Sequence, residues 1–165
     1  MDSVAVLDRG VAITFSFDEL MKYHGPGSPG GVAHAFKVMQ RAFPLLVPGG
    51  RPERREITIE TAFGGPGARD AFELVTRAVT GDRYVVDPGL ERPERGRTLE
   101  RFVFRLSCRG TEVTLLVREG LVTDEFIALV RKDRSEAEER HLTVLKQEMT
   151  DRVMARPADE VYDVV

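Results

Sequence analysis

The sequence predicts a single α+β domain, in which a mixed β-sheet of about four to five strands packs against helices and carries a helical C-terminal extension. A length of 165 residues fits one domain of common size. Short runs of alternating apolar residues predict strands, and longer segments with apolar residues at helical spacing predict helices. We assign residues 1–133 to the α+β domain, and 134–165 to a C-terminal helix and tail that belong to the same domain or to a dimer interface.

Composition and charge narrow the class of protein. Hydrophobic residues make up 42% and charged residues 31%, as in ordinary globular chains. The 24 basic and 27 acidic residues are interspersed and sum to −3, which argues against a nucleic-acid partner. Cys108 has no second cysteine to pair with, and no apolar run approaches the ~18 residues of a membrane span. We therefore expect a cytoplasmic protein without a membrane partner, and read Arg51–Arg55 as a solvated connector.

The N-terminal third begins with an apolar arm. Val4–Phe15 is apolar with β-branched members and predicts an irregular or short extended segment. Ser16 can cap a short helix over Phe17–Tyr23, because Glu19 stands three residues later in a capping-box pattern.

Two glycine- and proline-rich loops each lead into a helix. The first loop, His24–Gly31, precedes apolar residues at helical spacing from Val32 to Phe43, and this helix should end before Pro44. Ile57 and Ile59 then alternate with polar residues in a half-buried strand. The second loop, Gly64–Gly67, precedes a helix with apolar positions from Ala68 to Val79.

The rest of the chain alternates strands, loops and helices. A hairpin turning at Arg109-Gly110 is the clearest strand pattern, and the last helix has a narrow apolar stripe that should pack on one surface. The predicted elements are a strand at Tyr84–Val86, a polar loop over Asp87–Gly96, hairpin strands at Phe102–Cys108 and Val113–Val117, a helix over Thr123–Lys132, a helix over Ser135–Ala155 with the stripe Leu142, Leu145, Met149 and Val153, and a tail, Pro157–Val165, lying across the domain.

The two loops are the candidate ligand site. If their helices lie side by side, backbone N–H groups and two helix N-termini come together, an arrangement that favours a carboxylate or phosphate. Glycine-rich turns also exist simply to let chains pass closely, and neither loop matches a phosphate loop or a dinucleotide fingerprint. The candidate ligand-binding residues are Gly25, Gly27, Ser28, Gly30, Gly31, Gly65 and Gly67.

His24, at the mouth of the first loop, is the candidate acid/base group. The alternative is a helix C-terminal histidine bonded to backbone. Asp70 and Glu60 are the carboxylates best placed to face His24, and Ser28 can contact a ligand, act as a nucleophile or cap a helix. For three other residues the sequence predicts a structural role: His34 at the margin of the core, His141 on a solvated face and Cys108 buried in a strand.

A family resemblance covers nearly the whole chain. Tyr23–Gly31 resembles the His-Gly-His-x-Cys-Pro-Gly signature of proteins like the E subunit of formylmethanofuran dehydrogenase. Ile59-Glu60 with Asp70-Ala71, and the end Arg152–Val161, resemble later segments of that family. The resemblance implies a small α+β domain, a homodimer and a transition-metal site such as zinc.

This sequence departs from the signature at its metal ligands. Pro26 stands at the position of the second His and Ser28 at that of the Cys, which leaves His24 as the evident metal ligand. A zinc site needs three or four donors. The resemblance therefore implies a divergent member that kept the pocket and has a degenerate metal site.

Three hypotheses follow, and whether the protein is an enzyme stays open. The leading one is a protein that binds or modifies a small molecule between loops 24–31 and 64–67. The second is a non-catalytic accessory or structural subunit that associates through the C-terminal helix and the hairpin. The third is a metal-binding protein that retains His24, with Asp70, Glu60 or His34 as further donors.

Overall fold

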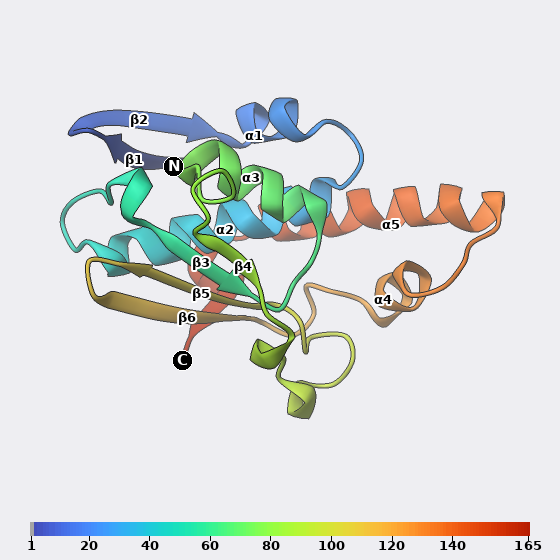
Figure 1. Cartoon of the computed structure of the whole chain (residues 1–165). Coiled ribbons are helices and arrows are strands. Elements are labelled where there is room, and N and C mark those ends of the chain that lie inside the picture. The colour runs from blue at the N-terminus through green and yellow to red at the C-terminus, as the bar shows by residue number, and fades with distance from the viewer. Residues whose placement is uncertain (1) are drawn as a thin grey trace.

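The computed structural model describes residues 2–165 and confirms the α+β class. A five-stranded sheet in the order β4-β3-β5-β6-β7 and a separate two-stranded sheet, β1-β2, accompany the helices (Figure 1). The strands are β1 (Ser3–Asp8), β2 (Val11–Ser16), β3 (Thr58–Thr61), β4 (Tyr84–Val86), β5 (Val103–Cys108), β6 (Thr111–Val117) and β7 (Tyr162–Val164). The α-helices are α1 (Phe17–His24), α2 (Pro29–Leu46), α3 (Pro66–Thr76), α4 (Asp124–Val130) and α5 (Glu136–Met154), and short 3-10 turns lie at Arg54–Glu56, Pro88–Leu90, Pro93–Arg95 and Ala158–Glu160.

Helix α2 forms the centre of the molecule. It runs between the β1–β2 hairpin with α1 on one side and the five-stranded sheet on the other (Figure 1). Every residue from Pro29 to Met39 is buried, because the helix is covered by neighbours all round rather than on one face. This position explains why the segment is apolar with few charges.

The five-stranded sheet is mixed and presents one face to the helices. Strand β3 pairs parallel with β4 and antiparallel with β5, and the remaining pairs are antiparallel. Ile59 and its neighbour Leu106 across the strands are fully buried on the helix-covered face. Successive side chains in a strand point to opposite faces, so Glu60 and its register partner Arg105 lie on the outer face.

The N-terminal arm corrects one expectation. Of the two alternatives, irregular or short extended, the segment Val4–Phe15 is extended, but as two paired strands, β1–β2, joined by a turn that was not predicted. Arg9 and Gly10 both have positive φ, 52° and 83°, as a two-residue type I′ turn requires. The same Arg-Gly pair turns the β5–β6 hairpin, where Arg109 and Gly110 have φ of 50° and 81°, and there the prediction is confirmed.

Helix α2 also runs past its expected end. Pro44 lies inside the helix, which continues to Leu46. Proline removes a single N–H here, and because it stands in the last turn few later hydrogen bonds depend on it. The backbone N–H of Val47 still donates to the carbonyl of Phe43 at 3.1 Å.

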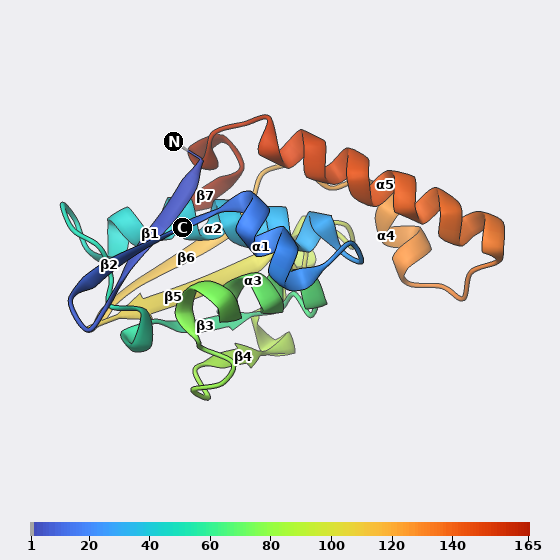
Figure 2. The same ribbon diagram turned by 90° about the horizontal axis from the view of Figure 1, so that it is seen from above.

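Helices α4 and α5 form an arm that extends past the end of the sheet, as Figures 1 and 2 both show. Ser135 caps α5 with Glu138 in a capping box, which confirms the predicted start. The stripe Leu142, Leu145, Met149 and Val153 is buried in the core of the same chain. A Cβ at Gly30 of α2 would lie 2.2 Å from Cε of Met149, so this glycine allows α5 to pack closely on α2. After α5, the tail adds β7 to the sheet edge beside β6.

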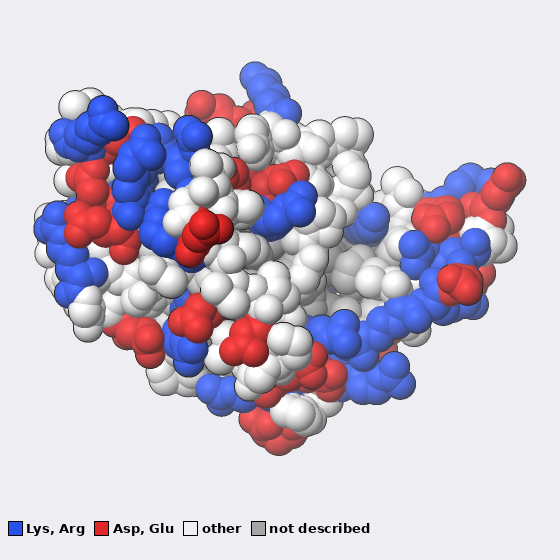
Figure 3. All heavy atoms as spheres, viewed as in Figure 1, with Lys and Arg blue, Asp and Glu red and all other residues white. Residues whose placement is uncertain are grey.

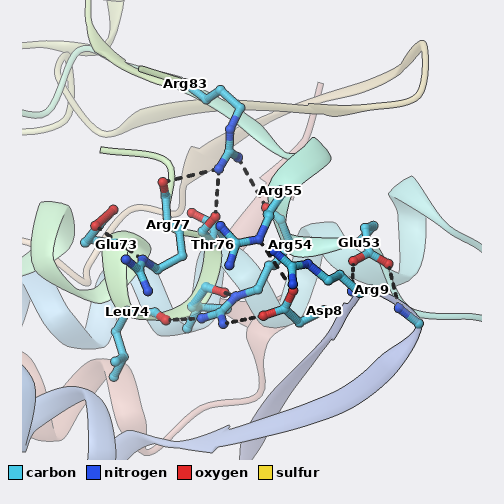
Figure 4. Close-up of polar contacts among 12 residues, drawn as sticks. Asp8, Arg9, Glu53, Arg54, Arg55, Glu73, Leu74, Thr76, Arg77 and Arg83 are labelled. Carbon is cyan, nitrogen blue, oxygen red and sulfur yellow. Dashed lines mark hydrogen bonds and ion pairs between the residues drawn. The ribbon is translucent and has the colours of Figure 1, made fainter. Parts of the chain in front are cut away.

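Arg54 corrects the expectation of a solvated connector at Arg51–Arg55. Its side chain is only 9% exposed and donates to the carbonyls of Leu74 and Val75 at 2.6 and 3.0 Å (Figure 4). Arg83 donates to the carbonyls of Thr76 and Arg77 at 3.0 and 3.2 Å. The two guanidinium groups thus satisfy the last carbonyls of α3, where positive charge is also favoured by the helix dipole.

No helix among residues 2–165 is long and apolar enough to cross a membrane.

Candidate functional site

The two glycine loops meet backbone to backbone, as the sequence led us to expect. A Cβ at Gly67 would lie 2.3 Å from the carbonyl oxygen of Ser28 and 3.0 Å from the backbone nitrogen of Val32. A Cβ at Gly31 would lie 3.0 Å from the backbone nitrogen of Ala68. Since no side chain fits between them, glycine is what lets α2 and α3 begin side by side.

His24 ties the first loop to α3. Its Nδ1 lies 2.8 Å from Oδ2 of Asp70, and its Nε2 accepts the backbone N–H of Ser28 at 3.0 Å. Because Nε2 accepts, the ring proton stands on Nδ1 and donates to the Asp70 carboxylate. The His24 side chain is 7% exposed. The structure thus brings His24 and Asp70 together, but both ring nitrogens are used in holding the loop.

Glu60 does not join His24 and Asp70. It lies on the outer face of the sheet, where both of its carboxylate oxygens accept from Arg105, at 2.8 and 3.2 Å. The expectation that Glu60 faces His24 was wrong because Ile59 points into the core, and a strand places the next side chain on the other face. A catalytic pair of Glu60 with His24 is therefore not available.

A cavity of about 410 Å³ opens where the two loops meet the α4–α5 arm. In Figure 3 it lies in the hollow between the body and the arm, with Lys and Arg side chains along the arm. Its floor and walls are largely apolar and aromatic, and its loop side includes Ser28, Gly30, Gly31, Gly65 and Gly67. The apolar side chains that line it include Phe63, Phe102, Phe126, Ile127, Leu142 and Met149.

Gly25 and Gly27 do not line this cavity. Gly25 ends α1 with φ of 88° and donates its N–H to the carbonyl of Met21 at 2.7 Å, so its role is to terminate that helix. Gly27 contributes through its carbonyl, which accepts from Nζ of Lys146 at 3.0 Å.

The charged residues around the cavity are all basic. Arg97, Arg101, Arg131, Arg134 and Lys146 line it, and no Asp or Glu from residues 2–165 does. Sequence reasoning missed these residues, because they come from the polar loop before β5 and from the α4–α5 arm. One signal was present in the sequence: Lys146 stands four residues after Leu142 and three before Met149, which places a charge beside the apolar stripe of α5.

Three of these cations are paired with acids. Arg101 lies 3.2 Å from Glu91, Arg131 lies 3.8 Å from Glu100, and Arg134 lies 2.8 Å from Glu139.

The other two have no carboxylate partner among residues 2–165. Among residues 2–165, Nζ of Lys146 bonds only the neutral carbonyl of Gly27, and the side chain of Arg97 makes no hydrogen bond or ion pair. The uncompensated positive charge of the cavity therefore resides on Lys146 and Arg97.

The helix starts at the cavity are open, unlike the others in this chain. Side chains of Ser16, Thr123 and Ser135 cap α1, α4 and α5. Helices α2 and α3 receive no side-chain cap and have no acidic residue in the first turn. Each has proline in its first turn instead, Pro29 and Pro66. The two helices whose first-turn amides lack a capping side chain are thus the two that begin at the cavity.

The residues at the resembling motif do not form a metal site. Among residues 2–165, no group of three or more His, Cys, Asp or Glu side chains is arranged to hold a metal ion. His34, a proposed further donor, is fully buried with Nδ1 2.8 Å from Oη of Tyr162. His24 would have to release Asp70 or Ser28 to offer a ligand nitrogen. The donor set therefore does not fit the transition metal that the resemblance implies.

The comparisons with known proteins add no relative. A scan against protein-family models finds no match, and a search of curated proteins finds none either. The resemblance of Tyr23–Gly31 and the later segments to the formylmethanofuran dehydrogenase E subunit stays a prediction.

Proposed function

We propose that this protein binds a small molecule in the cavity between loops 24–31 and 64–67 and the α4–α5 arm. The observation that carries the proposal is a cavity of about 410 Å³, with aromatic walls, at the place where two close-packed glycine loops start two helices. Cavities of ~300 to 1,000 Å³ with apolar walls and a few polar groups are typical of small-molecule sites.

The proposal is one of binding, with no reaction assigned. The candidate acid/base group, His24, has both ring nitrogens in internal contacts that fix the loop. Its contribution to binding is indirect, because it holds the loop whose Ser28 and Gly30 line the cavity. We accordingly treat His24 and Asp70 as positioning residues.

The two other hypotheses lose their supporting observations. The α5 stripe that suggested an accessory subunit packs on this chain's own core. The metal-binding hypothesis needs at least three donors, and the fold brings only Asp70 of the named candidates to His24.

A fragment screen tests the proposal. Uniformly labelled protein is titrated with a library of neutral, anionic and cationic fragments, and backbone amide shifts are followed by NMR. We expect saturable shifts at residues around the cavity, such as Gly65, Phe102 and Met149. A library that produces no saturable binding, or binding only elsewhere on the surface, overturns the proposal.

Two matched variants locate the binding site. Val130 lines the cavity and is 43% exposed, so Val130→Trp fills the cavity without a buried clash. Val144, on α5 and 51% exposed, does not line it, so Val144→Trp adds the same side chain outside. Fragments should lose affinity for Val130→Trp and keep it for Val144→Trp.

A further inference from the structure

We propose that the ligand of this cavity is an organic oxyanion, a carboxylate or phosphate joined to an apolar body. This inference rests on the proposed function, since it names the chemical class that the same cavity recognises. It combines three features of the cavity: its uncompensated charge, its open helix starts and its apolar wall.

The charge of the cavity selects for anions. All five charged side chains lining it are basic, while the chain as a whole carries a net charge of −3. Lys146 and Arg97 have no carboxylate partner within residues 2–165, so their charges are available to a ligand. The lining of the cavity is therefore basic, although the protein as a whole has an excess of acidic residues.

Lys146 occupies the decisive position. Its Nζ lies 3.0 Å from the carbonyl of Gly27, which holds the ammonium group beside the start of α2. The first turns of α2 and α3 have neither a capping side chain nor an acidic residue. An ammonium group and two helix N-termini thus face the same cavity, and each favours negative charge.

The remaining wall selects for an apolar body. Phe63 and Phe102 stack with ring centroids 4.6 Å apart, and Phe102 is 1% exposed. Ile127 and Met149 face the cavity from the arm. A bare inorganic ion would leave this surface wet, whereas a ligand with an aromatic or aliphatic part would cover it.

A matched series of probes tests the charge requirement. Phenylacetate and phenyl phosphate supply the two oxyanions, 2-phenylethanol is the neutral analogue and 2-phenylethylamine the cationic one. Acetate and inorganic phosphate lack the apolar body. Affinities are measured by NMR titration of the full chain at low ionic strength.

We expect at least one aromatic oxyanion to bind about tenfold more tightly than the alcohol, which corresponds to about 1.4 kcal/mol. The same aromatic oxyanion should bind more tightly than the ion without the ring, acetate for phenylacetate and inorganic phosphate for phenyl phosphate. The amine should bind most weakly. The ranking of phenylacetate against phenyl phosphate distinguishes a carboxylate ligand from a phosphate ligand.

Variants of α5 assign the effect to Lys146. Lys146→Met keeps an apolar stem without the charge, and should weaken binding of the aromatic oxyanion about five- to tenfold while leaving the alcohol unchanged. Lys146→Arg should restore most of the affinity. Arg140→Met removes a charge from an exposed position of the same helix outside the cavity and serves as the control.

The outcomes separate this inference from the proposed function. If the alcohol or amine binds in the cavity as tightly as the oxyanions, or if Lys146→Met behaves like Arg140→Met, the anion inference is wrong and the small-molecule cavity stands. If neither these probes nor the fragment library binds, both proposals are overturned.

Discussion

Gly67 lies so close to Ser28 that a Cβ at position 67 would stand 2.3 Å from the Ser28 carbonyl oxygen. This contact joins the start of α3 to the start of α2 through backbone alone. Backbone cannot move aside as a flexible side chain can, so any larger residue at position 67 forces the two loops apart at a cost in stability.

Gly67→Ala should therefore lower the free energy of unfolding by about 1 to 3 kcal/mol, as other overpacking substitutions with backbone displacement do. Urea denaturation followed by circular dichroism measures it. Gly27→Ala is the control, because a Cβ at Gly27 meets no atom within 4 Å. Equal effects of the two substitutions would show that the loops do not pack as described.

Removing the Asp70 carboxylate should loosen the first loop. Asp70→Ala leaves the Nδ1–H of His24 without its acceptor, which lies 2.8 Å away. We expect a loss of about 1 to 3 kcal/mol in the free energy of unfolding, since His24 is nearly buried. Asp133→Ala, at an exposed position whose side chain has no hydrogen bond or ion pair with residues 2–165, should change stability by less than about 0.5 kcal/mol.

Arg54 should contribute more to stability than its neighbour Arg55. Arg54→Met removes hydrogen bonds to the carbonyls of Leu74 and Val75 and the ion pair with Asp8. We expect the free energy of unfolding to fall by about 2 to 4 kcal/mol, because buried acceptors lose their donors. Arg55 is 48% exposed with one ion pair to Asp8 at 3.4 Å, and Arg55→Met should cost less than about 1 kcal/mol. A larger loss of stability for Arg55→Met than for Arg54→Met would contradict the role of Arg54 in capping the end of α3.

Acid should destabilise the protein through His34. Burial, with a smaller contribution from the charge of Arg152, lowers the pKa of His34 from 6.5 to about 3. The unfolded chain therefore takes up a proton below pH 6.5 that the folded chain refuses until about pH 3, so stability falls as the pH falls through this window. The His34 contribution amounts to about 2 kcal/mol between about pH 7 and pH 5.

Unfolding free energies of the wild type and His34→Gln at several pH values measure this effect. The variant should have a shallower dependence between about pH 5 and pH 6.5 than the wild type. His141→Gln is the control, because His141 is exposed and bonds only Glu125. Parallel curves for the wild type and His34→Gln would contradict a buried, neutral imidazole.

Local signals in the sequence predicted most of the fold. The capping boxes of Ser16 with Glu19 and of Ser135 with Glu138 depend on residues three positions apart, so both helix starts were correct. The β1–β2 hairpin was missed because Val4–Phe15 was taken as one apolar arm, although Asp8-Arg9-Gly10 interrupts it and forms the turn. Pro44 was given too much weight, because near a helix end it costs few hydrogen bonds.

The site was only partly predictable. The glycines that let two helices start together can be recognised in the sequence, but the other walls of the cavity come from segments far along the chain. Arg97 belongs to a polar loop without a periodic pattern, so nothing local indicated its place. Glu60 could have been assigned correctly from strand alternation alone, because the burial of Ile59 places it on the other face.

The prolines at the starts of α2 and α3 have an entropic consequence. Pro29 and Pro66 fix the backbone before any ligand arrives, and the contact between Gly31 and Ala68 holds the two openings together. Binding then requires little ordering of the chain. The entropic cost of binding is therefore small, and even a small ligand can bind with measurable affinity. Fast exchange with little change in backbone conformation is the kinetic behaviour that such a preorganised receptor should show.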